Sequence, residues 1–102
     1  MQYQVNASGS EIRVSLRGEL NFLANEDFQR FLLEVMPKAS GMTVVIDLAG
    51  IGRMDSVGLG LLYIAKEEFA GIKAPVVLAR PADAVFRLLE LTDAGKSFEI
   101  RR

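Results

Sequence analysis

Residues 42–62 read MTVVIDLAGIGRMDSVGLGLL and combine two different patterns. The first part, from Met42 to Leu48, is almost continuously apolar, which is typical of a strand that is buried on both faces. The second part begins a helix that we expect to run from Ser56 to about Ala70, with Gly71 as its stop. A buried strand followed directly by a helix predicts one unit of an α/β sheet.

Similar elements are predicted on both sides of this stretch. Residues 11–17 alternate polar and apolar side chains, as in a strand with one solvent-facing side, and residues 3–5 are its expected hairpin partner across a turn at 6–10. Apolar residues at helical spacing predict a helix that begins near Asn25, is capped by Asn21 or Asn25, and ends at Pro37. Downstream we expect a strand over 74–79, a helix from Ala82 to about Leu91, and a strand over 97–100.

The order of these elements is β-β-α-β-α-β-α-β. This order predicts an α/β fold whose sheet is mainly parallel or mixed, with an antiparallel edge and with helices packed against it. No linker or low-complexity segment interrupts the pattern, so we expect residues 1–102 to form a single domain.

Composition excludes several classes of function. The 102 residues contain no cysteine and no histidine, which rules out disulfides and catalytic sites of the Ser/His/Asp or Cys/His kind. Twelve basic and 13 acidic residues give no positive face for a nucleic-acid backbone. The N-terminal residues do not have the pattern of a secretion signal, and no stretch is long enough for a membrane span. We therefore expect a cytoplasmic protein that is not an enzyme, with no cofactor, metal, direct nucleic-acid contact or membrane insertion.

The predicted helix after Asp55 has two sides of different character. At about 100° per residue, the core side is predicted to contain Val57, Leu61, Ile64, Ala65 and Phe69. The solvent side is predicted to contain Ser56, Leu59, Gly60, Tyr63, Lys66 and Glu67. Two exposed apolar side chains beside an exposed serine and two glycines suggest a docking surface.

A purely structural interpretation of the same residues competes with this one. Asp55 and Ser56 are ordinary helix caps, and Gly58 and Gly60 could simply allow the helix to pack close to the sheet. Against it stands the cost of about 0.8–1 kcal/mol for each glycine placed in a helix. That cost favours a site that a partner approaches closely.

A third interpretation, a phosphate-binding loop or magnesium site, is weaker. The four glycines between positions 50 and 60 lack the spacing of either known phosphate-binding glycine motif. Asp47 and Asp55 could in principle hold Mg²⁺, but no basic residue besides Arg53 is expected to converge with them. We expect Asp47 to close a buried strand and Asp55 to orient the loop that carries Ser56.

Two segments, Asp47–Ile51 and Met54–Gly60, resemble the signature of the STAS domain, which is found in bacterial anti-sigma-factor antagonists. Leu16–Leu20 and Val85–Thr92 resemble further parts of that family's pattern. The similarity follows nearly the whole chain in order.

This resemblance implies a partner-switching protein. Ser56 would be phosphorylated by a serine kinase that doubles as an anti-sigma factor, and a PP2C-type phosphatase would reverse the modification. The unphosphorylated form would bind the kinase. The expected partner-binding residues are Asn21, Arg53, Asp55, Val57, Gly58, Leu59, Gly60 and Tyr63.

Two departures from the family pattern affect this expectation. Asn21 stands where relatives commonly have an aspartate, and Val57 stands where a second Ser or Thr often follows the phosphorylated one. Many relatives also carry another helix beyond the position of Arg102, so a second copy of the chain could cover part of the sheet as a homodimer. The alternative function is an accessory STAS subunit of a transport ATPase, bound constitutively and without phosphorylation of Ser56.

Overall fold

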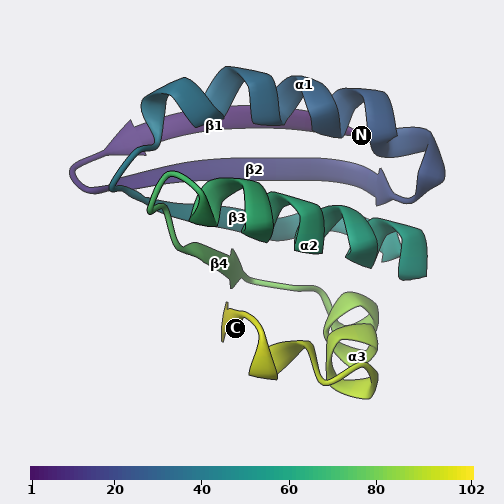
Figure 1. Cartoon of the computed structure of the whole chain (residues 1–102). Coiled ribbons are helices and arrows are strands. Elements are labelled where there is room, and N and C mark those ends of the chain that lie inside the picture. The colour runs from purple at the N-terminus through teal and green to yellow at the C-terminus, as the bar shows by residue number, and fades with distance from the viewer.

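The computed structural model describes all residues from Met1 to Arg102 (Figure 1). Its strands are β1 (Gln2–Ser8), β2 (Glu11–Leu20), β3 (Thr43–Met54), β4 (Val76–Ala79) and β5 (Glu99–Arg101). Its helices are α1 (Asn25–Val35), α2 (Ser56–Ala70) and α3 (Asp83–Leu91), and 3-10 turns lie at Phe22–Ala24, Met36–Lys38 and Ala94–Lys96. The predicted element order and the α/β fold class are confirmed.

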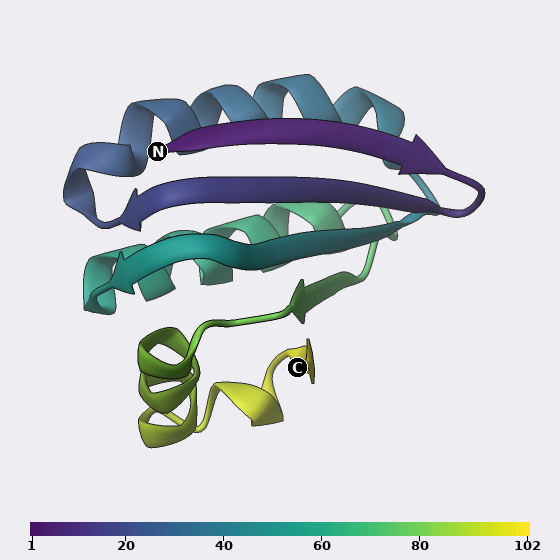
Figure 2. The same ribbon diagram turned by 180° about the vertical axis from the view of Figure 1, so that it is seen from behind.

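The five strands form one sheet in the order β1-β2-β3-β4-β5. β1 pairs with β2 antiparallel, and the other three pairs are parallel, as expected for a mainly parallel sheet with an antiparallel edge. α1 and α2 cover one face, whereas the view from behind looks directly onto the strands (Figures 1 and 2). We call the uncovered side the open face.

The main core fills the space between the sheet and the helices. Phe28 and Phe31 of α1 and Phe69 of α2 are fully buried there, against alternate residues of β2 that begin with Ile12 and Val14. On the open face, Val45, Val77 and Ala79 form a second, small buried cluster. β3 and β4 are therefore apolar on both sides, which explains their uninterrupted apolar sequence.

The prediction that β3 ends at Leu48 is wrong, because the strand continues to Met54. Its pairing with β2 contains two irregularities, at each of which β3 carries one residue more than β2. At the first, a Cβ atom on Gly50 would lie 2.6 Å from the carbonyl oxygen of Leu16. Gly50, which lies beyond the predicted strand, is thus the residue that lets β3 stay close to β2. The predicted turn at 6–10 is also shorter, since β1 extends to Ser8.

Candidate functional site

Two chain segments meet at the carboxyl ends of β2 and β3. Leu20, the last residue of β2, pairs with Met54, the last residue of β3. The backbone N–H of Asp55 donates to the carbonyl oxygen of Leu20 at 3.4 Å. This pairing places the 3-10 turn Phe22–Ala24 beside the first turn of α2, at the same end of the molecule in both views (Figures 1 and 2).

α2 begins at Ser56 and is capped by the preceding residue. Asp55 is extended, and its Oδ1 atom accepts a hydrogen bond from the N–H of Gly58 at 2.9 Å. The expectation that Asp55 orients the Ser56 loop agrees with this cap. Ser56 is exposed at the first helical position, where its backbone N–H has no partner within the helix.

The predicted orientation of α2 is confirmed for Leu61, Ala65 and Phe69, which are buried as expected, but it is wrong for three other residues. Val57 and Ile64, expected in the core, are 46% and 42% exposed, whereas Leu59, expected outside, is only 7% exposed. The buried residues of α2 are Gly58, Leu59, Leu61, Leu62, Ala65 and Phe69. Apolar residues occur on nearly every side of this helix, so periodicity alone defined its core poorly. Glu68, which falls within the predicted core stripe, was the signal against that orientation.

The two early glycines of α2 have different environments. A Cβ atom on Gly58 would lie 1.9 Å from the carbonyl oxygen of Leu20, so only glycine lets α2 pack against the end of β2. A Cβ atom on Gly60 would meet nothing within 4 Å. The structural interpretation therefore accounts for Gly58 but leaves Gly60, which is exposed, without a structural role.

Tyr63 and Arg53 lie on the borders of this region. Tyr63 is half-buried because its ring packs against Phe98, with 4.9 Å between the ring centroids. Arg53 is exposed near the end of β3, in register with Glu19 of β2. A role for either residue in partner binding stays a prediction.

Sequence reasoning missed two exposed apolar residues at this end of the molecule. Phe22 and Leu23 are 73% and 84% exposed on the 3-10 turn that follows β2. The turn is held by Asn21, whose Oδ1 atom accepts a hydrogen bond from the N–H of Leu23 at 3.0 Å. Asn21 is thus a cap, as predicted, but of this turn rather than of α1. A signal was available, since Phe22 and Leu23 do not fit the apolar spacing of the helix that follows.

We define the end surface as Asn21, Phe22, Leu23, Ser56, Val57, Gly60 and Ile64. It combines four exposed apolar side chains with one exposed hydroxyl and a glycine that leaves the helix backbone accessible. Isolated apolar side chains are common on protein surfaces, but several around one helix end are typical of a docking site. Gly58 and Leu59, expected in such a site, are buried beneath it.

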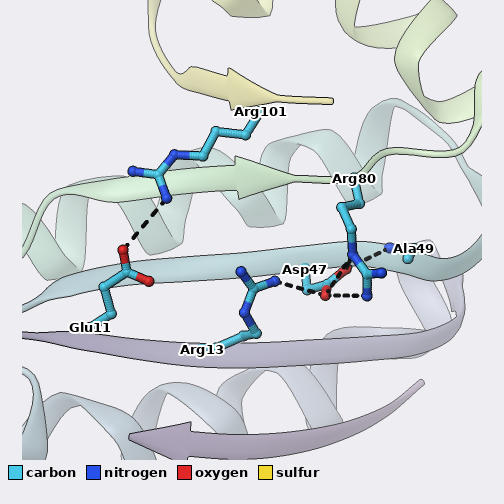
Figure 3. A network of polar contacts seen from close by, with 6 residues as sticks. All are labelled: Glu11, Arg13, Asp47, Ala49, Arg80 and Arg101. Carbon is cyan, nitrogen blue, oxygen red and sulfur yellow. Dashed lines mark hydrogen bonds and ion pairs between the residues drawn. The ribbon is translucent and has the colours of Figure 1, made fainter. Parts of the chain in front are cut away.

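Asp47 lies away from this surface, on the open face (Figure 3). It is 2% exposed and, rather than closing its strand, stands in the middle of β3. Its carboxylate accepts hydrogen bonds from Arg13 at 2.9 Å, from Arg80 at 2.7 Å and from the N–H of Ala49 at 3.0 Å. Burial alone would raise the pKa of Asp47, but these three donors outweigh it and hold the pKa below its usual value.

The expectation that no basic residue besides Arg53 approaches Asp47 is therefore wrong. With its oxygens already occupied by Arg13, Arg80 and Ala49, this carboxylate is a poor ligand for Mg²⁺. No three acidic or otherwise metal-binding side chains lie close enough together to share an ion. None of the three helices is both long and apolar enough to cross a lipid bilayer.

The sequence of this chain matches that of a known protein family. Residues 3–101 match the sequence model of a family described as "Mlab, STAS domain". The chain belongs to the STAS domain family. Among curated STAS relatives, a STAS-domain containing protein of Pseudomonas aeruginosa is 26% identical over 95 residues, which cover 93% of this chain and 92% of that protein. The anti-sigma-B factor antagonist of Listeria monocytogenes is 35% identical over 69 residues, or 68% of this chain and 60% of that protein.

Solved structures show the same STAS fold. An anti-sigma factor antagonist from Mycobacterium paratuberculosis superimposes with a TM-score of 0.85 at 23% identity, over 98% of this chain and 84% of that one. The antagonist SpoIIAA in its unphosphorylated form superimposes with a TM-score of 0.77 at 19% identity, over 99% of this chain and 89% of that one. SpoIIAA has also been solved in a phosphorylated form, with a TM-score of 0.70 at 18% identity, over 99% of this chain and 92% of that one. These identities are low, so the likeness concerns the fold.

Proposed function

We propose that this STAS domain is a regulatory binding protein of the anti-sigma-factor-antagonist type. A serine kinase that acts as an anti-sigma factor phosphorylates Ser56, a PP2C-type phosphatase removes the phosphate, and the unphosphorylated form binds the kinase. The domain itself is a substrate and ligand rather than an enzyme. The observation that carries this proposal is the exposed Ser56 hydroxyl at the start of α2, surrounded by exposed apolar side chains.

The position of Ser56 suits a modification that leaves the fold intact. A phosphoserine adds a charge of about −1.5 to −2 at neutral pH. The unpaired N–H groups and the dipole of a helix N-terminus favour such a charge. Because Ser56 contributes neither to the cap nor to the core, phosphorylation removes no contact that holds the domain together.

The same phosphate opposes binding once a partner covers it. A kinase that packs on Phe22, Leu23 and Val57 excludes water from Ser56, so a phosphate there would lose its hydration beside the carboxylate of Asp55. Desolvation of an unpaired charge costs several kcal/mol, and each 1.4 kcal/mol is about tenfold in affinity. Phosphorylation thus switches the end surface from binding to non-binding by electrostatics alone.

The test compares binding of one partner to modified and unmodified protein. The kinase is identified by capture on unphosphorylated protein, and its affinity is measured by calorimetry for wild type, Ser56→Asp and protein phosphorylated on Ser56. We expect phosphorylation to weaken binding by about a hundredfold or more and to leave the circular dichroism spectrum unchanged.

Ser40→Asp is the matched control. Ser40 is also exposed, but it lies just before β3 begins, whereas Ser56 follows the end of β3. This variant is expected to bind like wild type. Equal affinity of the kinase for phosphorylated and unphosphorylated Ser56 would contradict the proposed switch.

One observation also favours the alternative, an accessory subunit of a transport ATPase. Phe22 and Leu23 are exposed on a turn that Asn21 caps, and Ser56 takes no part in this cap. Their exposure therefore does not depend on modification of Ser56, which is compatible with a permanent interface. In that case the native protein would co-purify with an ATPase, and mass spectrometry would find Ser56 unmodified. Phe22→Ala would weaken both kinds of complex, so only the state of Ser56 separates them.

A further inference from the structure

The open face of the sheet is hollowed beside the first irregularity of β3. A cavity of about 430 Å³ lies there, large enough for a small metabolite. Its walls come from three neighbouring strands and from the residue that follows β4. The polar side chains that line it are Gln2, Gln4, Ser15, Arg17, Asp47 and Arg80. The floor includes Gly50, which is in register with Arg17 just after this irregularity.

Charge on the open face is divided between two ends. At one end Arg101 pairs with Glu99 at 2.7 Å and reaches across the sheet to Glu11 at 3.5 Å (Figure 3). At the other end, Arg17, Arg80 and Asp47 line the cavity, so its lining has an excess of one positive charge. Arg13 does not line the cavity but pairs with Asp47 from beside it. Because Arg13 balances the charge of Asp47, the four groups together carry an excess of two positive charges, in a chain whose net charge is −1.

The donors around the cavity are only partly used. Arg80 binds Asp47 through Nε and one terminal nitrogen, which leaves its other terminal nitrogen available. Arg17 donates to the neutral amide oxygen of Gln2 at 2.5 Å and pairs with no carboxylate. Ser15 and Gln4 add a hydroxyl and an amide to the same wall. Since the one acidic group is already neutralised, an anion entering the cavity meets donors on several sides.

Arg80 is held in a strained conformation. Its φ angle of 52° lies in the left-handed region, which a residue with a side chain rarely adopts. The strain is maintained by a hydrogen bond of 2.6 Å from the Arg80 N–H to the carbonyl oxygen of Arg101. Strained residues cluster at ligand sites. The Arg80 guanidinium lies against the carboxylate of Asp47 (Figure 3), and both residues line the cavity.

We propose that this cavity binds a small soluble phosphate monoester, with Arg17 and Arg80 contacting the phosphate oxygens. Because Arg13 balances Asp47, Arg17 and Arg80 are left to match the charge of a dianion. A tetrahedral phosphate can accept from these two guanidinium groups, the hydroxyl of Ser15 and the amide of Gln4 at once. The site lies on the open face, whereas α2 lies on the other side of the sheet (Figures 1 and 2). Ser56 is the first residue of α2. Binding there is independent of the proposed phosphorylation.

The test uses inorganic phosphate and glycerol 3-phosphate as probes and follows backbone amide resonances by NMR, with sodium chloride at equal ionic strength as the reference. We expect saturable shifts at Ala49, Gly50 and Arg17, with millimolar or tighter affinity for glycerol 3-phosphate. Arg17→Gln is expected to raise its dissociation constant about tenfold. The matched control Arg87→Gln removes an exposed arginine of α3 and should change that constant less than twofold.

Three results would overturn the proposal. The first is a shift that grows linearly with added salt and is reproduced by chloride. The second is saturable binding centred on the N-terminus of α2 instead of the cavity, with no effect of Arg17→Gln. The third is binding to vesicles that contain phosphatidic acid without binding to glycerol 3-phosphate, which would assign the positive charge to a lipid surface.

Discussion

The two sides of α2 use the same residue types for different purposes. On the inner side, Leu59 is buried and Gly58 fits against the end of β2, where there is no room for a Cβ atom. On the outer side, Gly60 and Ile64 face solvent, and a Cβ atom at position 60 would touch nothing. The same motif therefore contains residues that the fold requires, on the inner side, and residues that are available for binding, on the outer side. Only the packing of α2 against the sheet shows which residue belongs to which side.

The largest expected difference between these sides is at the glycines. Gly58→Ala would force α2 away from the backbone of β2, and we expect it to lower the free energy of unfolding by about 3–5 kcal/mol. Gly60→Ala should instead raise it by about 0.5–1 kcal/mol, because alanine favours the helix. Urea unfolding measures both changes. If Gly58→Ala were as stable as Gly60→Ala, the close contact with Leu20 would be absent in solution.

The aliphatic residues provide a second comparison, which tests the orientation of the helix. Leu59→Ala removes buried methyl groups and should cost about 2–4 kcal/mol of stability. Ile64→Ala removes a side chain that is 42% exposed and should cost about 1 kcal/mol or less. The reverse ranking in thermal or urea unfolding would restore the orientation that the sequence suggested. Binding of the proposed kinase should respond in the opposite way and weaken more with Ile64→Ala.

A smaller effect is expected at Asp47, on the other side of the sheet. Asp47→Asn replaces a carboxylate that receives three hydrogen bonds and should lower stability by about 1–2 kcal/mol at neutral pH. Since the pKa of Asp47 is lowered in the folded protein, its contribution is complete above the unfolded value of 3.8. The contribution is then lost as the pH falls through the lower pKa of the folded state.

Urea unfolding between pH 7 and pH 2 checks this pH dependence. The difference in the free energy of unfolding between wild type and Asp47→Asn should stay constant down to about pH 4 and become smaller below it. Asp83→Asn is the control, because Asp83 is fully exposed and its one ion pair, with Arg102, is 3.8 Å long. If this difference in the free energy of unfolding increased on acidification, the ionised carboxylate would destabilise the fold, contrary to this prediction.

Most of the fold could be predicted because local patterns and tertiary packing agree. The alternation in β2, the apolar runs of β3 and β4 and the spacing of Phe28 and Phe31 in α1 each indicate the element that forms. The second half of β3 could not be predicted in this way. Gly50 and Gly52 look like strand breakers along the chain, and the role of Gly50 depends on the backbone of the neighbouring strand.

The candidate site was predicted in its position but not in its composition. Ser56 at the start of α2 and the cap by Asp55 follow from local sequence, because caps act within a few residues. Phe22 and Leu23 join the surface only because β2 and β3 end side by side, which is a tertiary fact. The pairing of Asp47 with Arg13 and Arg80 likewise joins β3, β2 and the residue after β4, which are far apart in sequence.

Strand order has a consequence for how the chain assembles. Each strand pairs with the strand that precedes it, so the sheet can grow in one direction while the polypeptide is synthesised, without inserting a strand between two that are already paired. The end surface, built from the turn after β2 and the first turns of α2, is encoded entirely before Gly71. The later strands then cover the edge of β3. A nascent chain thus completes the segments that carry its partner surface before it completes its sheet.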